Sequence, residues 1–239
     1  MIKLILDYKQ IIKNMIHQVK PRIIALIPMK GESERIPNKN MRDFAGQPLC
    51  SVLLDKLVSS KIIDKIVVNT DSDRIKNFLI KRYDQINIID RPKGLIGNDV
   101  SMNKIIDYDM NQTSADIYIQ THSTNPLLSI QTIEDAIDKW IKKKKDFDSL
   151  FSVNKYQTRF YDQNGVALNH DPGLLLKTQD LSPLYEENSC LYIFTKESFK
   201  KKNRRIGETP LMFEIDSVES TDIDVEDQFI LAEKLFKIL

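Results

Sequence analysis

Two groups of charged residues, one near each end of the chain, have the residue types that phosphate chemistry requires. The first is a loop that carries Lys30, Arg35 and Lys39 directly after an apolar run. Cationic side chains and backbone N–H groups that follow a buried strand bind phosphate oxygens in many α/β proteins. The second is the pair Asp222 and Asp224, whose alternation on an extended segment puts both carboxylates on one side. Such a pair is a hard oxygen site for Mg²⁺ or Mn²⁺, so the sequence predicts metal-assisted chemistry on a phosphate.

Each group also has an ordinary structural explanation. The loop has one glycine, Gly31, whereas the Walker and dinucleotide fingerprints each need more. Mixed charges in an exposed loop are common, so the loop alone is equally consistent with a solvated surface. Two aspartates that precede an amphipathic helix, with no other motif beside them, are also typical of an acidic helix N-terminus.

The order of residues in the loop favours the functional explanation. The stretch Ile-Pro-Met-Lys-Gly-Glu-Ser-Glu-Arg-Ile-Pro-Asn-Lys-Asn, residues 27–40, resembles the signature of the acylneuraminate cytidylyltransferase family, the CMP-sialic acid synthetases. It is less closely similar to the CMP-Kdo synthetases. The matching residues are Ser33, Ile36, Pro37, Lys39 and Asn40. Lys30 stands where the family usually has arginine, and Glu34 where it often has lysine.

The end of the chain extends the resemblance. The family has an Ile-Asp-Ile-Asp motif followed by an Ala-Glu-bearing helix, and here Asp222, Asp224, Phe229 and the pair Ala232-Glu233 match it. The resemblance thus covers residues 21–239. It implies a Rossmann-like nucleotide-diphosphosugar transferase fold, a mostly parallel central sheet flanked by helices, CTP as substrate and Mg²⁺ on the two aspartates.

The resemblance also assigns roles to individual residues. Lys30, Arg35 and Lys39, with the two aspartates, are expected to be catalytic. The residues expected to border the nucleotide are Pro28, Met29, Lys30, Gly31, Asn40, Thr70, Arg91, Asp99 and Ser101, the last three at the cytosine. Those expected to contact the sugar are Gln120, Lys177, Asn188 and Tyr192.

The acceptor end departs from the family's pattern. Sialic acid enzymes place arginines before the strand that begins at Asn188, where they can pair with an acidic substrate. Here Lys177 is the only cation in that approach, and Glu186 and Glu187 directly precede Asn188. Like charges in a poorly solvated site disfavour binding. Either Lys177 or a residue elsewhere therefore supplies the positive charge, or the preferred acceptor is a relative of N-acetylneuraminate.

The hydrophobic pattern predicts the elements that position these residues. Short runs rich in β-branched residues predict strands over residues 23–27, 65–70, 86–90, 116–120, 150–153, 188–194 and 212–215. Helical periodicity predicts helices over residues 49–60, from about 74, over 130–145 and over 229–239. His122 follows the 116–120 strand, but one histidine without a visible partner is weak evidence for a general base.

Two segments lie outside this pattern. Residues 1–20 predict an amphipathic helical extension before a cytidylyltransferase domain over residues 21–239. Residues 154–187 are rich in turn signals, and a long irregular segment in a compact domain is usually functional. The resemblance implies that this segment is an arm for dimerisation and substrate binding, and hence that the protein is a homodimer.

Composition limits the other function classes. A formal net charge of +1 gives no reason to expect a nucleic-acid or membrane partner. The two cysteines, Cys50 and Cys190, have no metal or redox spacing, and the N-terminus has no signal-peptide pattern, so we expect a cytoplasmic protein with reduced thiols.

The sequence therefore predicts transfer of a cytidylyl group from CTP to the hydroxyl of a 2-keto sugar acid, with release of pyrophosphate. Two alternatives stay open at this point. One is another sugar or polyol nucleotidyltransferase on the same fold. The other is a non-catalytic nucleotide-binding relative, for which the weakly basic loop is the only hint.

Overall fold

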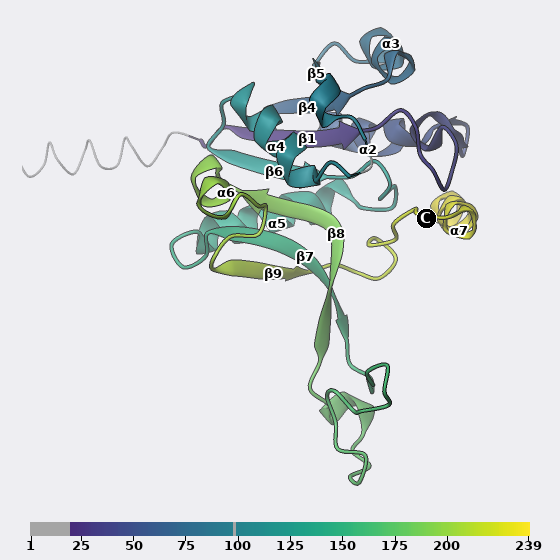
Figure 1. Cartoon of the computed structure of the whole chain (residues 1–239), viewed down its shortest axis with the longest axis vertical. Coiled ribbons are helices and arrows are strands. Elements are labelled where there is room, and N and C mark those ends of the chain that lie inside the picture. The colour runs from purple at the N-terminus through teal and green to yellow at the C-terminus, as the bar shows by residue number, and fades with distance from the viewer. Residues whose placement is uncertain (1–19, 98) are drawn as a thin grey trace, which may run out of the picture.

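The computed structural model describes residues 20–97 and 99–239 (Figure 1). The predicted N-terminal helix therefore falls, apart from Lys20, outside the described residues. The centre of the fold is a seven-stranded sheet with the order β5-β4-β1-β6-β8-β7-β9. Its strands are β1 (Ile23–Met29), β4 (Lys65–Thr70), β5 (Ile86–Asp90), β6 (Ile117–Thr121), β7 (Ser149–Tyr156), β8 (Leu184–Phe194) and β9 (Pro210–Glu214).

The strand pairing gives the sheet a predominantly parallel character. Strand β1 pairs in parallel with β4 and β6, and β9 pairs in parallel with β7. Strand β8 runs antiparallel to both of its neighbours, β6 and β7. The fold class is confirmed, and β1, β4, β5 and β6 all end at one edge of the sheet, where α/β proteins bind ligands.

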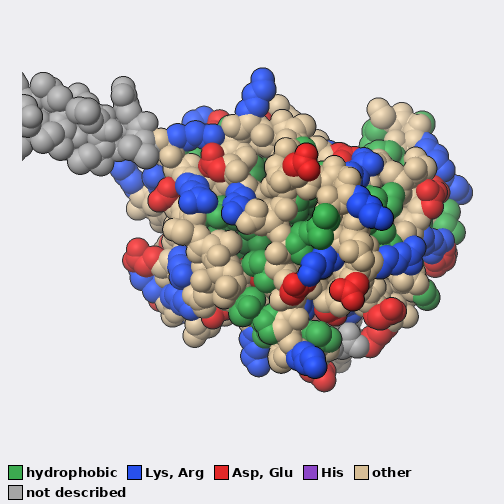
Figure 2. Space-filling view, turned by 90° about the horizontal axis from the view of Figure 1, so that it is seen from above, with side chains coloured by type: hydrophobic (Ala, Val, Ile, Leu, Met, Phe, Trp, Pro, Cys, Tyr) green, Lys and Arg blue, Asp and Glu red, His purple; other side chains and the backbone are tan. Residues whose placement is uncertain are grey.

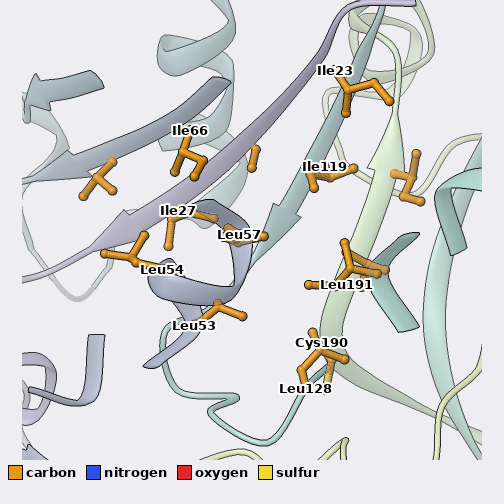
Figure 3. Packing of buried hydrophobic residues seen from close by; sticks show 14 of the residues in the cluster. Ile23, Ile27, Leu53, Leu54, Leu57, Ile66, Ile119, Leu128, Cys190 and Leu191 are labelled. Atoms are coloured by element: carbon orange, nitrogen blue, oxygen red, sulfur yellow. The ribbon is translucent and has the colours of Figure 1, made fainter. Parts of the chain in front are cut away.

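Helices cover both faces of the sheet. They are α2 (Leu49–Ser59), α3 (Asp73–Arg82), α4 (Met102–Asn111), α5 (Ile130–Lys143), α6 (Lys196–Lys202) and α7 (Glu226–Ile238). Alternate residues of β1 point to opposite faces, so Ile23 and Ile27 pack with α2 and α5 in one core cluster, part of which is shown in Figure 3. Ile24 and Leu26 pack in the other cluster with α4 and α6.

The sequence pattern did not predict α4 or α6. Helix α4 begins after Ser101, whose hydroxyl accepts a hydrogen bond from the Asn103 N–H, and it buries Ile105, Ile106 and Met110 at helical spacing. Helix α6 begins after Thr195, which exchanges capping hydrogen bonds with Ser198. Both helices are short, and their apolar residues are few compared with those of α5.

Helix α7 holds the charged loop in place from the far end of the chain. Ile223, Phe229 and Ala232 form a third buried cluster with Ile36 and Phe44 of the loop region. Arg42 adds a bidentate ion pair to Glu226, with distances of 2.5 and 2.6 Å, and its guanidinium stacks on the Phe229 ring. The two charged regions of the sequence therefore fold as one unit, as their neighbouring positions in Figure 1 show.

Strands β7 and β8 continue beyond the sheet as a long two-stranded projection (Figure 1). Residues 153–156 pair with 184–187, so the irregular segment is shorter than predicted and covers residues 157–183. Several of its apolar side chains are exposed, and Leu175 is 92% exposed.

The surface carries both signs of charge. Basic and acidic side chains are interspersed on the face shown in Figure 2, in keeping with the net charge of +1. Within residues 20–97 and 99–239, no helix has the length and apolar character needed to cross a bilayer.

Candidate active site

A cavity of about 410 Å³ opens at the carboxyl edge of the parallel strands. It is formed by the segments that follow β1, β5 and β6, together with the Asp222–Asp224 segment. The residues predicted for the site that line this cavity are Pro28, Met29, Lys30, Arg35, Lys39, Asn40, Arg91, Asp222 and Asp224. The topology of the sheet thus brings together residues from distant parts of the sequence.

The charged loop is tied to the neighbouring strand end by Asn40. Its side-chain amide donates a hydrogen bond to the Lys30 carbonyl at 2.9 Å, and its Oδ1 accepts one from the Ser123 hydroxyl at 2.6 Å. Ile36 is fully buried in the middle of the loop. Because the loop is anchored at these points, Lys30, Arg35 and Lys39 are held at the wall of the cavity.

The cations of the loop meet the carboxylates of the C-terminal segment. Arg35 Nη2 lies 2.6 Å from Asp224 Oδ1, and Lys39 Nζ lies 3.9 Å from the same oxygen. Lys39 also donates a hydrogen bond to the Ile223 carbonyl at 2.5 Å. Burial lowers the pKa of Lys39, while the two aspartates oppose that shift.

The two aspartates of the Asp222–Asp224 segment could together hold a divalent cation. Ile223 is buried between the two aspartates, and its N–H donates to the Thr124 carbonyl at 2.9 Å, so both carboxylates face the cavity. Asp222 Oδ1 is buried without a hydrogen-bond partner, and burial, with the charge of Asp224, raises the pKa of Asp222. An orphaned carboxylate oxygen beside a second carboxylate fits a cation.

The donor set indicates which cation. No third histidine, cysteine, aspartate or glutamate within residues 20–97 and 99–239 joins Asp222 and Asp224 in a metal-binding group. Mg²⁺ suits such a site, because it commonly takes one or two carboxylates and fills its other positions with water and substrate phosphate oxygens. The residues therefore fit Mg²⁺ bound together with a phosphate ligand.

Arg91 is positioned by a buried network at another side of the cavity. Its Nε donates to Asn69 Oδ1 at 2.8 Å and its Nη2 to the Asn69 carbonyl at 2.9 Å. Asn69 in turn donates to the carboxylate of Asp109 at 2.5 Å. Asp109 is fully buried, and burial raises its pKa to about 7. The network fixes the guanidinium of Arg91 before any ligand arrives.

His122 and Arg205 line the cavity near β6 and β8, and both are connected to Gln120. Arg205 Nη1 donates to Gln120 Oε1, and the Gln120 amide nitrogen lies 2.9 Å from His122 Nε2. Arginine can only donate, so Gln120 must donate to His122, and His122 Nε2 must accept. Burial, with the nearby positive charges of Arg205 and Lys39, lowers the pKa of His122 to about 3. The imidazole is therefore neutral and its Nε2 lone pair is occupied.

Several predicted nucleotide contacts lie away from the cavity wall. The N–H of Gly31 donates to Asp71 at 2.7 Å, and a Cβ on Gly31 would come within 2.8 Å of the Ser72 Cβ, so Gly31 serves close packing. Thr70 is buried, and its carbonyl accepts the N–H of Arg91. Asp99 is exposed and Ser101 caps α4, whereas Gly97, Val100 and Met102 of the same segment line the cavity.

The four residues predicted to contact the sugar also lie outside the lining of this cavity. Lys177 is exposed at the start of a short turn in the projection, outside the cavity lining. Asn188 links β7 to β8, because its Oδ1 accepts from the Ser152 hydroxyl at 2.5 Å. Gln120 is buried behind His122 and Arg205. Tyr192 lies beneath Arg205, whose guanidinium is 3.9 Å from the centre of the tyrosine ring.

The two glutamates before Asn188 are both exposed. Glu186 accepts a hydrogen bond from the Tyr156 hydroxyl at 2.8 Å, and Glu187 accepts one from the Tyr192 hydroxyl. Arg205 has no clear signal in the sequence, because it lies in a basic stretch, residues 200–205, that is typical of a solvated surface. Arg205 reaches the cavity because the chain after α6 passes back over β6 and β8, where its guanidinium contacts Gln120 and Tyr192.

Comparisons with known proteins agree with this geometry. The family model described as cytidylyltransferase matches residues 24–236. A pseudaminic acid cytidylyltransferase of Campylobacter jejuni is 25% identical over 226 residues, which cover 90% of this chain and 96% of that protein. A CMP-N,N'-diacetyllegionaminic acid synthase of Legionella pneumophila is 26% identical over 91% of this chain and 97% of that protein.

Other relatives are longer than this chain. An N-acylneuraminate cytidylyltransferase of Streptococcus agalactiae is 27% identical over 87% of this chain but only 51% of that protein. Among solved structures, a CMP:2-keto-3-deoxy-manno-octonic acid synthetase complexed with CTP superposes with a TM-score of 0.65 at 13% identity, covering 91% of this chain and 99% of that one. At this identity the structural likeness concerns the fold.

Proposed function

The chain belongs to the cytidylyltransferase family, and from this premise we propose that it transfers the cytidylyl group of CTP to a hydroxyl of a 2-keto sugar acid of the nonulosonate class. One observation carries the proposal. Three cations, Lys30, Arg35 and Lys39, and the two aspartates line a single cavity at the ligand-binding edge of the sheet. The relatives named above, which act on pseudaminic, legionaminic and N-acylneuraminic acids, support the acceptor class.

The residues divide the reaction between them. Lys30, Arg35 and Lys39 face the triphosphate and offset the charge that develops on it, while Arg91 holds the nucleoside end. The acceptor hydroxyl forms a bond to the α-phosphorus in line with the departing pyrophosphate, the α–β phosphoric anhydride bond breaks, and the hydroxyl proton passes to solvent. Mg²⁺, held by Asp222 and Asp224, would polarise the phosphate oxygens when bound.

A pyrophosphate-release assay tests the reaction class. Each of the four nucleoside triphosphates is combined with a panel of 2-keto sugar acids and Mg²⁺. We expect release with CTP and a nonulosonate. Release with UTP, or with a polyol acceptor, would assign the chain to a different nucleotidyltransferase activity. Failure of every combination, while CTP still binds, would favour a non-catalytic nucleotide-binding role.

We propose further that N-acetylneuraminate is a poorer acceptor than a nonulosonate with additional amino or amide groups. Glu187 is exposed on β8, and its negative charge would face the acceptor, which favours an acceptor that carries additional N–H donors. The kcat/KM values for N-acetylneuraminate, Kdo, legionaminic acid and pseudaminic acid test the order. A value for N-acetylneuraminate equal to or above the others would contradict the role of Glu187.

We also propose that the projection over residues 157–183 contacts a second copy of the chain. Exposed apolar side chains gather there, including Tyr161, Val166, Leu168 and Leu175. Exposed apolar patches of this kind mark contact surfaces, and a dimer would bury them. Sedimentation or light scattering at micromolar concentration should give the mass of a dimer, and a monomeric mass would refute the proposal.

A further inference from the structure

A second hollow, of about 370 Å³, adjoins the nucleotide cavity. Its lining includes Glu187, Tyr192 and Arg205, and Arg205 lines both spaces. A group that borders both spaces can contact a molecule that reaches from the hollow to the nucleotide. An acceptor sugar has to reach the nucleotide from an adjoining space of this kind if its hydroxyl is to attack the α-phosphorus.

Arg205 is fixed in one orientation. Its guanidinium stacks on the ring of Tyr192 at 3.9 Å, and Nη1 donates to Gln120, which is itself buried. A planar guanidinium held by a ring and an amide loses little further freedom when it binds a ligand. The side chain is therefore pre-organised for recognition.

The charge of Arg205 is not neutralised within the described part of the chain. No carboxylate among residues 20–97 and 99–239 lies within ion-pair distance of its guanidinium, and Glu187 acts on it only at longer range. Burial lowers its pKa, yet arginine stays protonated at any physiological pH. A partly buried cation that keeps N–H groups available favours an anionic ligand.

We propose that Arg205 binds the carboxylate of the acceptor sugar acid and that the hollow beside Tyr192 is the acceptor subsite. Arginine receives a carboxylate through two parallel N–H bonds, which fixes orientation as well as position. In a 2-keto sugar acid the carboxylate and the attacking hydroxyl share one carbon. An arginine at the boundary of the two spaces would therefore align that hydroxyl with the nucleotide. The proposal rests on the proposed function, since it names how the same site holds its acceptor.

The phosphates of CTP are the competing ligand for Arg205. The cations assigned to them lie on the loop after β1, and Arg35 and Lys39 pair with Asp224 of the C-terminal segment. Arg205 instead contacts β6 and β8. The two sets of cations thus belong to different walls. Kinetics can separate them, because a carboxylate contact changes the KM for the acceptor and a phosphate contact changes the KM for CTP.

The test compares Arg205→Gln, Arg205→Lys and wild type in the pyrophosphate-release assay, with each substrate varied in turn. We expect Arg205→Gln to raise the acceptor KM by about 30- to 100-fold and to leave the CTP KM within about threefold. Arg205→Lys keeps the charge but not the planar fork, so it should recover part of the loss. Lys201→Gln is the matched control, since it removes an exposed cation that pairs with Glu197 on α6, away from both spaces.

An acceptor whose carboxylate has been converted to the neutral amide gives the decisive comparison. The wild type should discriminate strongly against this amide, whereas Arg205→Gln should lose most of that discrimination. A merely structural role for Arg205 would lower activity towards both acceptors equally. That outcome, or a selective rise in the CTP KM, would overturn the proposal.

The failure of this inference is distinguishable from failure of the proposed function. If wild type releases pyrophosphate with a sugar acid but Arg205→Gln keeps the wild-type acceptor KM, then only the subsite assignment is wrong. If wild type is inactive with every sugar acid, the reaction class itself is wrong. Thermal unfolding of each variant shows whether the substitution has disturbed the fold.

Discussion

The two walls of the active-site region treat charge in different ways. On the wall formed by the loop after β1, the protein supplies both the cations and the carboxylates that neutralise them, and Arg35 lies 2.6 Å from Asp224. On the wall formed by β6 and β8, Arg205 is held by an amide and an aromatic ring, and within the described residues no carboxylate pairs with it. On the first wall, Arg35 and Lys39 already have an internal carboxylate partner in Asp224, whereas the second wall leaves the charge of Arg205 for a ligand.

This difference has a mechanical consequence. If Mg²⁺ and a triphosphate bind to the first wall, Arg35 must exchange Asp224 for phosphate, so that wall must rearrange. The Arg35–Asp224 pair is largely exposed, and such pairs contribute little to stability. The exchange therefore costs little free energy. The second wall needs no exchange, because Arg205 and Tyr192 are already in place. The comparison can be tested by removing one member of each wall.

Asp224→Asn should have the largest effect. It keeps the shape of the side chain and removes one of the two carboxylates proposed to hold Mg²⁺, so we expect turnover to fall about a hundredfold or more. Turnover measured against Mg²⁺ and Mn²⁺ concentration should show a matching loss of metal affinity.

Glu226→Gln is the matched control for Asp224→Asn. It also removes an acidic partner of a loop cation, because Glu226 pairs with Arg42, but its carboxylate lies outside the cavity lining. We expect Glu226→Gln to keep turnover within a few-fold of wild type. If folded Asp224→Asn turns over as fast as this control, the metal assignment is wrong.

Lys39→Ala should have the next largest effect, with turnover reduced about tenfold to a hundredfold. Lys39 is the least exposed of the loop cations in ion pairs with Asp224, at 11% of its side chain against 59% for Arg35. A less solvated charge acts more strongly on a phosphate. Specific activity and melting temperature are measured together. A large drop in melting temperature with nearly unchanged activity would show that Lys39 is a structural lysine.

The same contrast explains how much the sequence could predict. Lys30, Arg35 and Lys39 lie on one loop next to a clear strand, so pattern and resemblance located them without knowledge of the topology. Gln120, Tyr192 and Arg205 come from three separate segments, and only the packing of β6 against β8 brings them together. Lys177 is the only cation in the sequence approach to Asn188, but the pairing of β7 with β8 places it in the projection. The requirement for glycine at position 31 is likewise set by a close contact, with Ser72, that the sequence does not reveal.

Asp109→Asn should change the pH dependence of stability. Burial raises the pKa of Asp109 to about 7, whereas the ordinary pKa of an aspartate is 3.8. The unfolded chain therefore loses this proton at lower pH than the folded chain. The contribution of Asp109 to the free energy of unfolding should therefore fall by about 1.4 kcal/mol for each unit by which the pH rises between about 4 and 7.

Asparagine cannot ionise, so Asp109→Asn should remove that slope. Denaturant unfolding at pH 5 and pH 8 measures it. We expect the stability of the variant relative to wild type to improve by about 2 to 3 kcal/mol over this range. An unchanged difference at the two pH values would mean that Asp109 is ionised in the folded protein and that Arg91 is held by a charged network.

His122→Gln should have the smallest effect, although a histidine in an active-site cavity is the natural candidate for a general base. Burial lowers the pKa of His122 to about 3, and the Gln120 amide occupies its Nε2. The imidazole therefore does not take up a proton near neutral pH. A glutamine can accept the same hydrogen bond. We therefore expect kcat within about threefold of wild type, with the same dependence on pH from 6 to 8. The measurement is kcat as a function of pH for both proteins with saturating CTP and acceptor. If the wild-type profile has an inflection in this range and the variant loses it, then His122 titrates during turnover, and the wall formed by β6 and β8 supplies the base as well as the acceptor's cation.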